Sequence, residues 1–335
     1  MNSTCEKVAL LTASYAFKFV LSAKIGVNIG GLIVLIYSYA KVMKTQKFAA
    51  LHVNVRLALH LHAYYIGHVI VFMFTGNVID LYRLSAHHAD PCDYRLPFWL
   101  TYIVRQGYMF GVLGQTLTFV FLSVERIIAT FRKGYEHNTS KTSFVLSALL
   151  NVVVCFGYAY VYMGYDADWS AQTEFFTQAN ERNGGRLSYF VYCMIACECF
   201  SILLYNVTYL LNSRGKIRID SRDQHINKSL TEKYQIDENR RVVVLLLPVC
   251  WIHFGIYMLT YAGYFLFIKA TYVYDTVLFE CLIEGLGLIV LYAYIFSFRI
   301  LRYFVWKRRV SMTTENTDEY FTQMNALFQF VASTR

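Results

Sequence analysis

Seven long apolar stretches constrain the fold of this chain more than any other feature of its sequence. The hydrocarbon core of a bilayer is about 30 Å thick, and a helix needs roughly 20 apolar residues to cross it. Each stretch is too long for a strand of a membrane barrel, whereas a helix satisfies its own backbone hydrogen bonds in lipid. The stretches are Phe19–Ala40, Leu57–Ile79, Phe98–Val124, Ser143–Met163, Leu187–Leu211, Val242–Ile268 and Thr276–Phe298.

The composition excludes an ordinary soluble globular protein. Hydrophobic residues make up 56% of the chain and charged residues only 16%, whereas about a quarter of a soluble domain is charged. We therefore predict an all-α membrane protein with one domain, a seven-transmembrane helix bundle at residues 19–298. An extracellular N-terminal segment precedes it at residues 1–18, and residues 299–335 form a cytoplasmic amphipathic helix and tail.

The distribution of basic residues predicts the orientation of the bundle. The segments after the first, third, fifth and seventh spans hold 22 of the 31 Lys and Arg residues, and the N-terminus with the other connecting segments holds seven. Basic residues near span ends stay in the cytoplasm, so the N-terminus is expected outside and the C-terminus inside. The net charge of +9 is then an orientation signal that also suits an anionic lipid bilayer, and we expect no nucleic-acid partner.

No cleavable signal peptide is expected before the first span. Residues 1–18 lack the apolar core and the small-residue cleavage site of such a peptide. The first span is therefore expected to start membrane insertion itself. It carries Lys24 five residues from its predicted outer end, where we expect the ammonium to snorkel to the interface.

An adjacent acid and base, Glu125 and Arg126, follow the third span where the helix should leave the membrane. An arginine at this edge, held by the neighbouring glutamate, suits a two-state switch that is neutralised when closed and released towards a partner when open. With seven spans, Arg126 falls on the inner side of the third. This combination points to a receptor coupled to an intracellular protein.

The basic segment between the fifth and sixth spans predicts a helix that extends the sixth span into the cytosol. It runs from residue 212 to 241, and its last part starts with a capping box at Ser229 and Glu232. On this helix Tyr234 and Arg241 would share a face, because they are seven residues apart. Pro248 lies inside the sixth span and is expected to kink it.

Four charged residues inside spans predict a polar pocket that opens outward. Arg105 precedes Arg126 by 21 residues, or about 31 Å along a helix axis, which places it at the outer rim. Intramembrane carboxylates usually face a bundle interior or a cavity. Arg105 either contacts a ligand, or is snorkelled to the interface or ion-paired. For Glu198 in the fifth span, a protonated carboxyl group that hydrogen-bonds a neighbouring helix is at least an equal alternative to a place in the pocket. The candidate pocket residues are Arg105, Glu198, Glu280 and Glu284.

Two of the eight cysteines lie in external segments, where oxidation is permitted. A disulfide between Cys5 and Cys92 would tie the N-terminus to the top of the third span and is the simplest pairing. Cys92 with Cys193 is the alternative, because Cys193 lies only two turns below the start of the fifth span. The sequon that begins at Asn2 predicts glycosylation outside.

A histidine cluster in the second span raises the possibility of a metal-dependent membrane enzyme. His60 and His62 are two residues apart and do not share a helix face, while a metal site needs four convergent donors. Polar packing explains these residues and His68 better. We expect no metal, no cofactor and no catalytic residues.

Three motifs together resemble nematode serpentine receptor class alpha/beta, with the sister class alpha next. They are Asp90-Pro91-Cys92-Asp93, the stretch from Val124 to Thr130, and the stretch from Ser229 to Arg240, and the resemblance runs from Cys5 to about Trp306. The resemblance implies a GPCR-like chemosensory receptor in the plasma membrane of sensory neurons. Such a receptor binds a small-molecule ligand and activates a heterotrimeric G protein. Carried onto this sequence, the coupling residues are Glu125, Arg126, Tyr234, Arg240 and Arg241.

The sequence departs from the larger rhodopsin-like class at two switch positions. Ile127 follows the Glu-Arg pair where that class has tyrosine, and the seventh span has no Asn-Pro-x-x-Tyr because no proline follows Pro248. The role of Arg126 therefore carries over, while the usual seventh-span switch does not.

Other classes of membrane protein are weaker alternatives. A seven-helix ligand-gated cation channel of the insect-receptor type has its N-terminus inside, against the asymmetry of basic residues. A transporter is expected to have internal repeats or paired broken helices, and an enzyme a convergent catalytic set. We recognise neither in this sequence.

Overall fold

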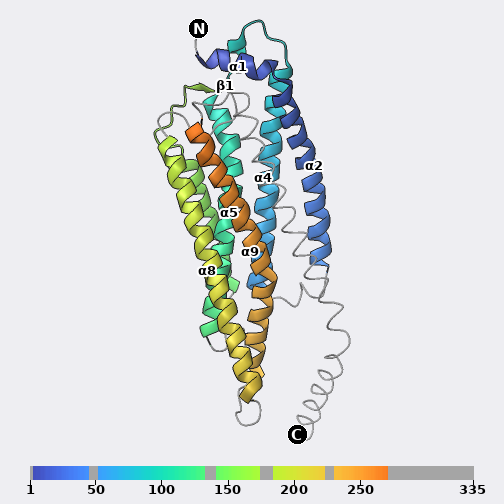
Figure 1. The fold of residues 1–335 in the computed structure, drawn as a ribbon, viewed down its shortest axis with the longest axis vertical. Coiled ribbons are helices and arrows are strands. Elements are labelled where there is room, and N and C mark those ends of the chain that lie inside the picture. The colour runs from blue at the N-terminus through green and yellow to red at the C-terminus, as the bar shows by residue number, and fades with distance from the viewer. Residues whose placement is uncertain (1–2, 45–51, 133–140, 174–183, 223–229, 271–335) are drawn as a thin grey trace.

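A computed structural model describes residues 3–44, 52–132, 141–173, 184–222 and 230–270. Over these residues the chain forms one elongated bundle of long helices that lie side by side (Figure 1). Six of the described helices are long and apolar enough to cross a membrane. The predicted seventh span at residues 276–298 and the predicted helix and tail at residues 299–335 lie outside the described residues.

The first six predicted spans coincide with helices. The long helices are α2 (Tyr15–Met43), α4 (Val53–Ser85), α5 (Phe98–Phe131), α7 (Lys141–Phe156), α8 (Gly184–Arg222) and α9 (Leu230–Ala270), with a short helix α1 (Ser3–Ala13) before them. Two shorter helical segments, η1 (Pro91–Tyr94) and the π-helical η2 (Gly157–Tyr162), and two short strands, β1 (Leu96–Pro97) and β2 (Gln172–Thr173), complete the described part.

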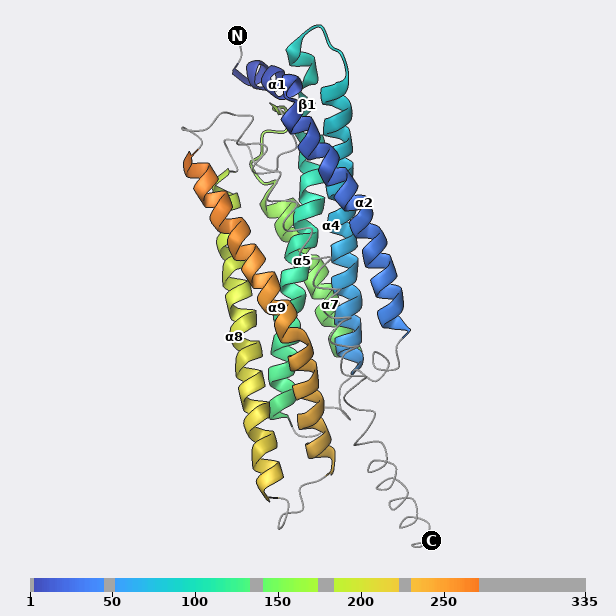
Figure 2. The same ribbon diagram turned by 45° about the vertical axis from the view of Figure 1, so that its right-hand side comes forward.

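Helix α5 occupies the centre of the bundle and is packed against α4, α7, α8 and α9. Figures 1 and 2 show α8 and α9 running together along one side of it, while α2 lies on the far side of α4. Buried apolar residues of α5, α8 and α9, such as Leu122, Tyr205 and Leu246, form a core near one end. The same core includes residues of α2 and α4, such as Val42 and Leu59. Because Arg126 follows directly after this core on α5, its position in the bundle is set by apolar packing on five helices.

Glycines on one face of α5 let α4 approach closely. A methyl group added at Gly111 would lie 2.5 Å from the Val69 side chain and 2.9 Å from the backbone oxygen of Tyr65. At Gly107 and Gly114 it would overlap the rings of Phe72 and Tyr65. Small residues at helix contacts allow the close packing that drives association in lipid, so this face fixes the position of α4.

We expect Gly111→Ala to destabilise the purified protein by about 1–3 kcal/mol, because the methyl group meets backbone as well as a side chain. Thermal unfolding in detergent measures the effect. Gly30→Ala is the matched control, since nothing lies within 4 Å of a methyl group there, and it should be neutral or slightly stabilising. Equal melting temperatures for the two variants would contradict the close packing of α4 and α5.

Helix α2 buries one narrow stripe and leaves the rest of its surface outward. Its buried residues recur every three or four positions, which is the 3.5-residue period of a helix packed along a single partner. Apolar side chains such as Ile33 and Ile36 are exposed on the other faces, as expected for a helix in lipid. The buried stripe consists of Phe17, Leu21, Lys24, Asn28, Gly31, Leu35, Ser38 and Val42.

Helix α1 lies across one end of the bundle, called here the outer end (Figure 1). The side-chain oxygen of Ser14 accepts a hydrogen bond from the backbone N–H of Phe17 at 3.2 Å, which caps α2 directly after α1 ends. Val8 and Leu11 pack against Leu84 of α4. The sequence predicts an extracellular N-terminal segment here without specifying its secondary structure, and the structure shows that it contains a helix that covers the outer end.

A second segment closes the outer end on the side of α5. Strands β1 and β2 pair antiparallel, with Leu96 opposite Thr173, and the backbone N–H of Phe98 donates to the oxygen of Ala171 at 3.0 Å. The hydroxyl of Tyr102 donates to the backbone oxygens of Ala159 and Tyr160 in η2, each at 3.1 Å. The first turns of α5 are therefore held by the segment that follows η2.

Candidate functional sites at the two ends of the bundle

Arg126 lies at the opposite end, called here the inner end, and links α5 to α9. Its side chain is 2% exposed. Two of its nitrogens donate to the two carboxylate oxygens of Glu125, each at 2.5 Å, and Nη1 donates to Oδ1 of Asn239 at 2.9 Å. The arginine is thus neutralised by its neighbour, which is the arrangement predicted for a closed switch, and it is also bonded to a different helix.

Further polar contacts extend this group to α4. Nδ2 of Asn54 donates to Oε1 of Glu125 at 3.2 Å, and the ring of His52 lies 3.9 Å from the same oxygen. Glu125 therefore receives donors from α4 and α5, while Arg126 reaches α9. We call Asn54, Glu125, Arg126 and Asn239 the inner polar cluster.

The other predicted coupling residues follow on α9. Arg240 is half-buried next to Asn239, and Arg241 is exposed. Tyr234 lies further toward the start of the same helix. Helix α9 is continuous from Leu230 through Pro248, and the inner ends of α8 and α9 project beyond that of α5 (Figure 2).

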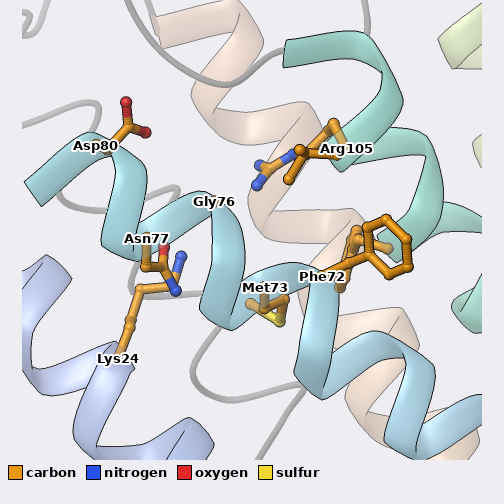
Figure 3. A pocket seen from close by; sticks show the side chains of 9 residues that line it. Lys24, Phe72, Met73, Gly76, Asn77, Asp80 and Arg105 are labelled. Atoms are coloured by element: carbon orange, nitrogen blue, oxygen red, sulfur yellow. The ribbon is translucent and has the colours of Figure 1, made fainter. Parts of the chain in front are cut away.

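Arg105 lines a pocket near the outer end, between α2, α4 and α5. Its guanidinium also lies over the ring of Tyr108, 5.6 Å from the centroid. Figure 3 shows the basic side chains of Arg105 and Lys24 entering the pocket from different helices, with Asn77 of α4 next to Lys24. The lining residues are Lys24, Phe72, Met73, Gly76, Asn77, Asp80, Val104, Arg105 and Tyr108.

The snorkelling prediction for Lys24 was wrong. The side chain is 1% exposed and belongs to the buried stripe of α2. The predicted span began at Phe19, whereas α2 begins at Tyr15, so Lys24 lies two and a half turns inside the helix and faces the bundle.

The acidic residue of the pocket is already paired. Nη2 of Arg83 donates to Oδ1 of Asp80 at 2.7 Å, one turn along α4. Nη1 of Arg83 donates to the backbone oxygen of Tyr94 in η1. Asp80 and Arg83 therefore connect the pocket to the segment that carries Cys92.

Glu198 lies apart from this pocket, in the middle of the bundle. It is 2% exposed, and its Oε1 accepts from the Thr116 hydroxyl at 2.7 Å and lies 3.0 Å from Nδ1 of His253. These contacts join α5, α8 and α9. Interhelical hydrogen bonding, the alternative weighed for this residue from the sequence, matches this geometry.

The structure joins Cys5 of α1 to Cys92 of η1 by a disulfide. This is the first of the two pairings weighed above, and Cys193 is a free, exposed cysteine on α8. Asn2, Glu280 and Glu284 lie outside the described residues, so their predicted roles rest on the sequence alone.

The second-span histidines contact aromatic groups. Nδ1 of His60 lies 2.5 Å from the Tyr39 hydroxyl, and the ring of His62 packs edge-on against Phe119. Within the described ranges, no three His, Cys, Asp or Glu side chains are placed to hold a metal ion.

Sequence reasoning missed Asn54 and Asn239 at the inner end and Lys24 and Asn77 in the outer pocket. Asparagine is an ordinary surface residue of helix ends, and although Asn239 lies in the third stretch of the resemblance, the sequence assigned no role to either inner asparagine. Lys24 did produce one, as a charge inside a span, but its helix face was not considered.

Comparison with known proteins assigns the chain to a family. No match to an individual curated protein was found. The profile of the family described as serpentine type 7TM GPCR receptor class ab chemoreceptors matches residues 2–332, nearly the whole chain. The apolar helices and this match together make it a multi-pass, all-α membrane protein of the seven-helix type. The chain belongs to the serpentine class ab chemoreceptor family.

Proposed function

We propose that this protein is a chemosensory receptor that binds a small molecule from outside and activates a heterotrimeric G protein. The observation that carries the proposal is the hydrogen bond from Arg126 of α5 to Asn239 of α9. It holds a buried basic side chain at the inner end, next to the two helices that project furthest there. A hydrogen bond that forms in the closed state and breaks in the open state distinguishes two states, and a ligand that binds one of them better shifts the equilibrium between them.

The proposed mechanism moves the inner end of α9 away from α5. This motion breaks the bond to Asn239 and uncovers Arg126, whose guanidinium can then bond the C-terminal carbonyls or carboxylates of a Gα subunit. Tyr234, Arg240 and Arg241 would form the adjacent part of the same surface. A ligand that favours the open bundle shifts a pre-existing equilibrium toward this state.

The orientation follows from the basic asymmetry of the connecting segments, with α1 and the disulfide outside and Arg126 inside. We place the receptor in the plasma membrane of a sensory cell, with a glycan at Asn2. The outer pocket lined by Arg105 is then open to ligands from outside, and Glu280 and Glu284 are its predicted further acids.

The test is nucleotide exchange on a panel of Gα subunits in membranes that carry the receptor, with and without a panel of small odorants. Arg126→Ala should reduce stimulated exchange at least about tenfold, because a charge-assisted hydrogen bond contributes about 1.5–3 kcal/mol. Arg95→Ala is the control, since it removes an equal charge at the outer end, where its Nε donates to the backbone of Cys92.

Surface expression of the three proteins must be equal for the comparison. Exchange with the wild type that persists in Arg126→Ala would contradict the role of Arg126. A ligand-gated current in the same membranes without exchange on any Gα subunit would contradict the receptor proposal and favour a cation channel.

A further inference from the structure

A buried tyrosine in the apolar core near the inner end has a hydroxyl without a hydrogen bond in the described part of the chain. Tyr205 of α8 is 0% exposed, and its Oη bonds no atom among the described residues. The hydroxyls of two other buried tyrosines are bonded, Tyr65 to Asn151 at 3.0 Å and Tyr102 to the backbone oxygen of Ala159 at 3.1 Å. A buried hydroxyl that bonds nothing destabilises the state that contains it, so the Tyr205 hydroxyl favours an arrangement of the helices that gives it a partner.

Tyr205 packs beside the two helix turns that form the inner hydrogen bond. It belongs to the same core as Leu122 of α5 and Val243 of α9. Leu122 lies one turn before Arg126, and Val243 lies one turn after Asn239, because a helical turn has 3.6 residues. The charge of Arg126 acts electrostatically on the Tyr205 hydroxyl. The hydroxyl therefore lies near the guanidinium, although the two form no hydrogen bond in this structure.

Arg126 loses an acceptor when the inner end of α9 moves away. Nε and Nη2 donate to the Glu125 carboxylate, and Nη1 donates to Asn239 at 2.9 Å. Glu125, whose charge also acts on the Tyr205 hydroxyl, precedes Arg126 in the chain and moves with it, whereas Asn239 leaves with α9. A buried charged donor that loses its acceptor is costly, so the open state gains stability from a new acceptor for Nη1. The oxygen of a tyrosine hydroxyl can accept a hydrogen bond as well as donate one.

We propose that the Tyr205 hydroxyl accepts a hydrogen bond from the Arg126 guanidinium in the open state, in place of Asn239. Tyr205 is then a positioning residue of the switch, because it stabilises the open state and holds Arg126 toward α8. The hydroxyl favours opening twice, since it is unbonded in the closed state and bonded in the open one. The inference rests on the opening of α9 in the proposed function, but it does not depend on which intracellular protein binds the open bundle.

The first experiment measures the open fraction directly, by electron–electron resonance distances in the full-length receptor in nanodiscs. Spin labels replace Ile128 of α5 and Arg241 of α9, both exposed, and are carried by non-canonical amino acids so that the native cysteines stay unlabelled. Asn239→Leu should populate longer distances, because it removes the closing bond. Adding Tyr205→Phe should lower the ratio of open to closed receptors at least about tenfold, because the open state then lacks its bond to a charged group.

Thermal unfolding separates this role from a structural one. Tyr205→Phe alone should keep or raise the melting temperature of the purified receptor, because the hydroxyl bonds no described residue in the closed state. Tyr65→Phe is the matched control, since Tyr65 is also 0% exposed but donates to Asn151. It should lower the melting temperature, and in the Asn239→Leu background it should leave the ratio of open to closed receptors unchanged.

The outcomes separate the role of Tyr205 from the receptor proposal. Fewer open receptors in the double variant, with no loss of stability in Tyr205→Phe, support the role. An unchanged or larger open fraction overturns it, as do short distances that persist in Asn239→Leu or equal losses of stability in the two tyrosine variants. Closing by Tyr205→Phe without exchange on any Gα subunit would keep the role and count against the receptor mechanism alone. Ligand-stimulated exchange with an open fraction that ignores Tyr205→Phe would do the reverse.

Discussion

Asn239→Leu is expected to raise basal nucleotide exchange about tenfold, because a hydrogen bond to a charged group contributes about 1.5–3 kcal/mol to the state that contains it. Asn239 is 3% exposed, and its Oδ1 is the acceptor that binds Arg126 to α9. Leucine keeps the volume but cannot accept, so the closed state loses this bond while the open state loses nothing. Exchange on the responsive Gα subunit without ligand measures the effect.

Asn206→Leu is the matched control for this prediction. The amide of Asn206 donates to the backbone oxygen of Ile202 in its own helix, at 2.8 Å, so its loss should leave basal exchange unchanged. The two partners of the inner hydrogen bond should act in opposite directions, with Arg126→Ala lowering exchange and Asn239→Leu raising it. If the two variants merely destabilise the bundle, nucleotide exchange falls in both of them. That result would contradict a closing contact between α5 and α9.

The sequence predicted the centre of the inner polar cluster but not its partners. Glu125 and Arg126 are adjacent and end a long apolar run, so their place at a membrane edge follows from position alone. Asn54 is 71 residues before its partner Glu125 in the sequence, and Asn239 is 113 residues after its partner Arg126. Contacts across such separations depend on which helices are neighbours and on how each is rotated, and helix periodicity specifies neither.

Lys24 illustrates a second limit of reasoning from spans. Lys18, six residues before Lys24, interrupts the apolar run, so the span predicted from the sequence begins later than α2 does and places Lys24 near the interface. The buried stripe of α2, with Leu21 and Asn28 on either side of Lys24, is the signal that places the side chain inside. Because lysine and asparagine occupy that stripe, a pattern built on apolar residues alone does not reveal it.

The middle of the bundle carries the largest expected loss of stability. Glu198→Leu removes the acceptor that bonds both Thr116 and His253. Leaving a buried donor unbonded costs about 1–3 kcal/mol, and the change leaves two such groups, on Thr116 and His253, without this acceptor. Thermal unfolding of the purified receptor should show the loss, whereas Cys199→Leu, at an exposed position on the same helix, should be nearly neutral.

A double variant distinguishes this pairing from a ligand contact by Glu198. In Glu198→Leu with His253→Phe both partners become apolar, and the ring of phenylalanine can keep the packing that His253 has against Phe119 and Tyr257. The double variant should then be more stable than the sum of the two single losses implies, by about 1–3 kcal/mol. Additive losses would exclude a direct pair.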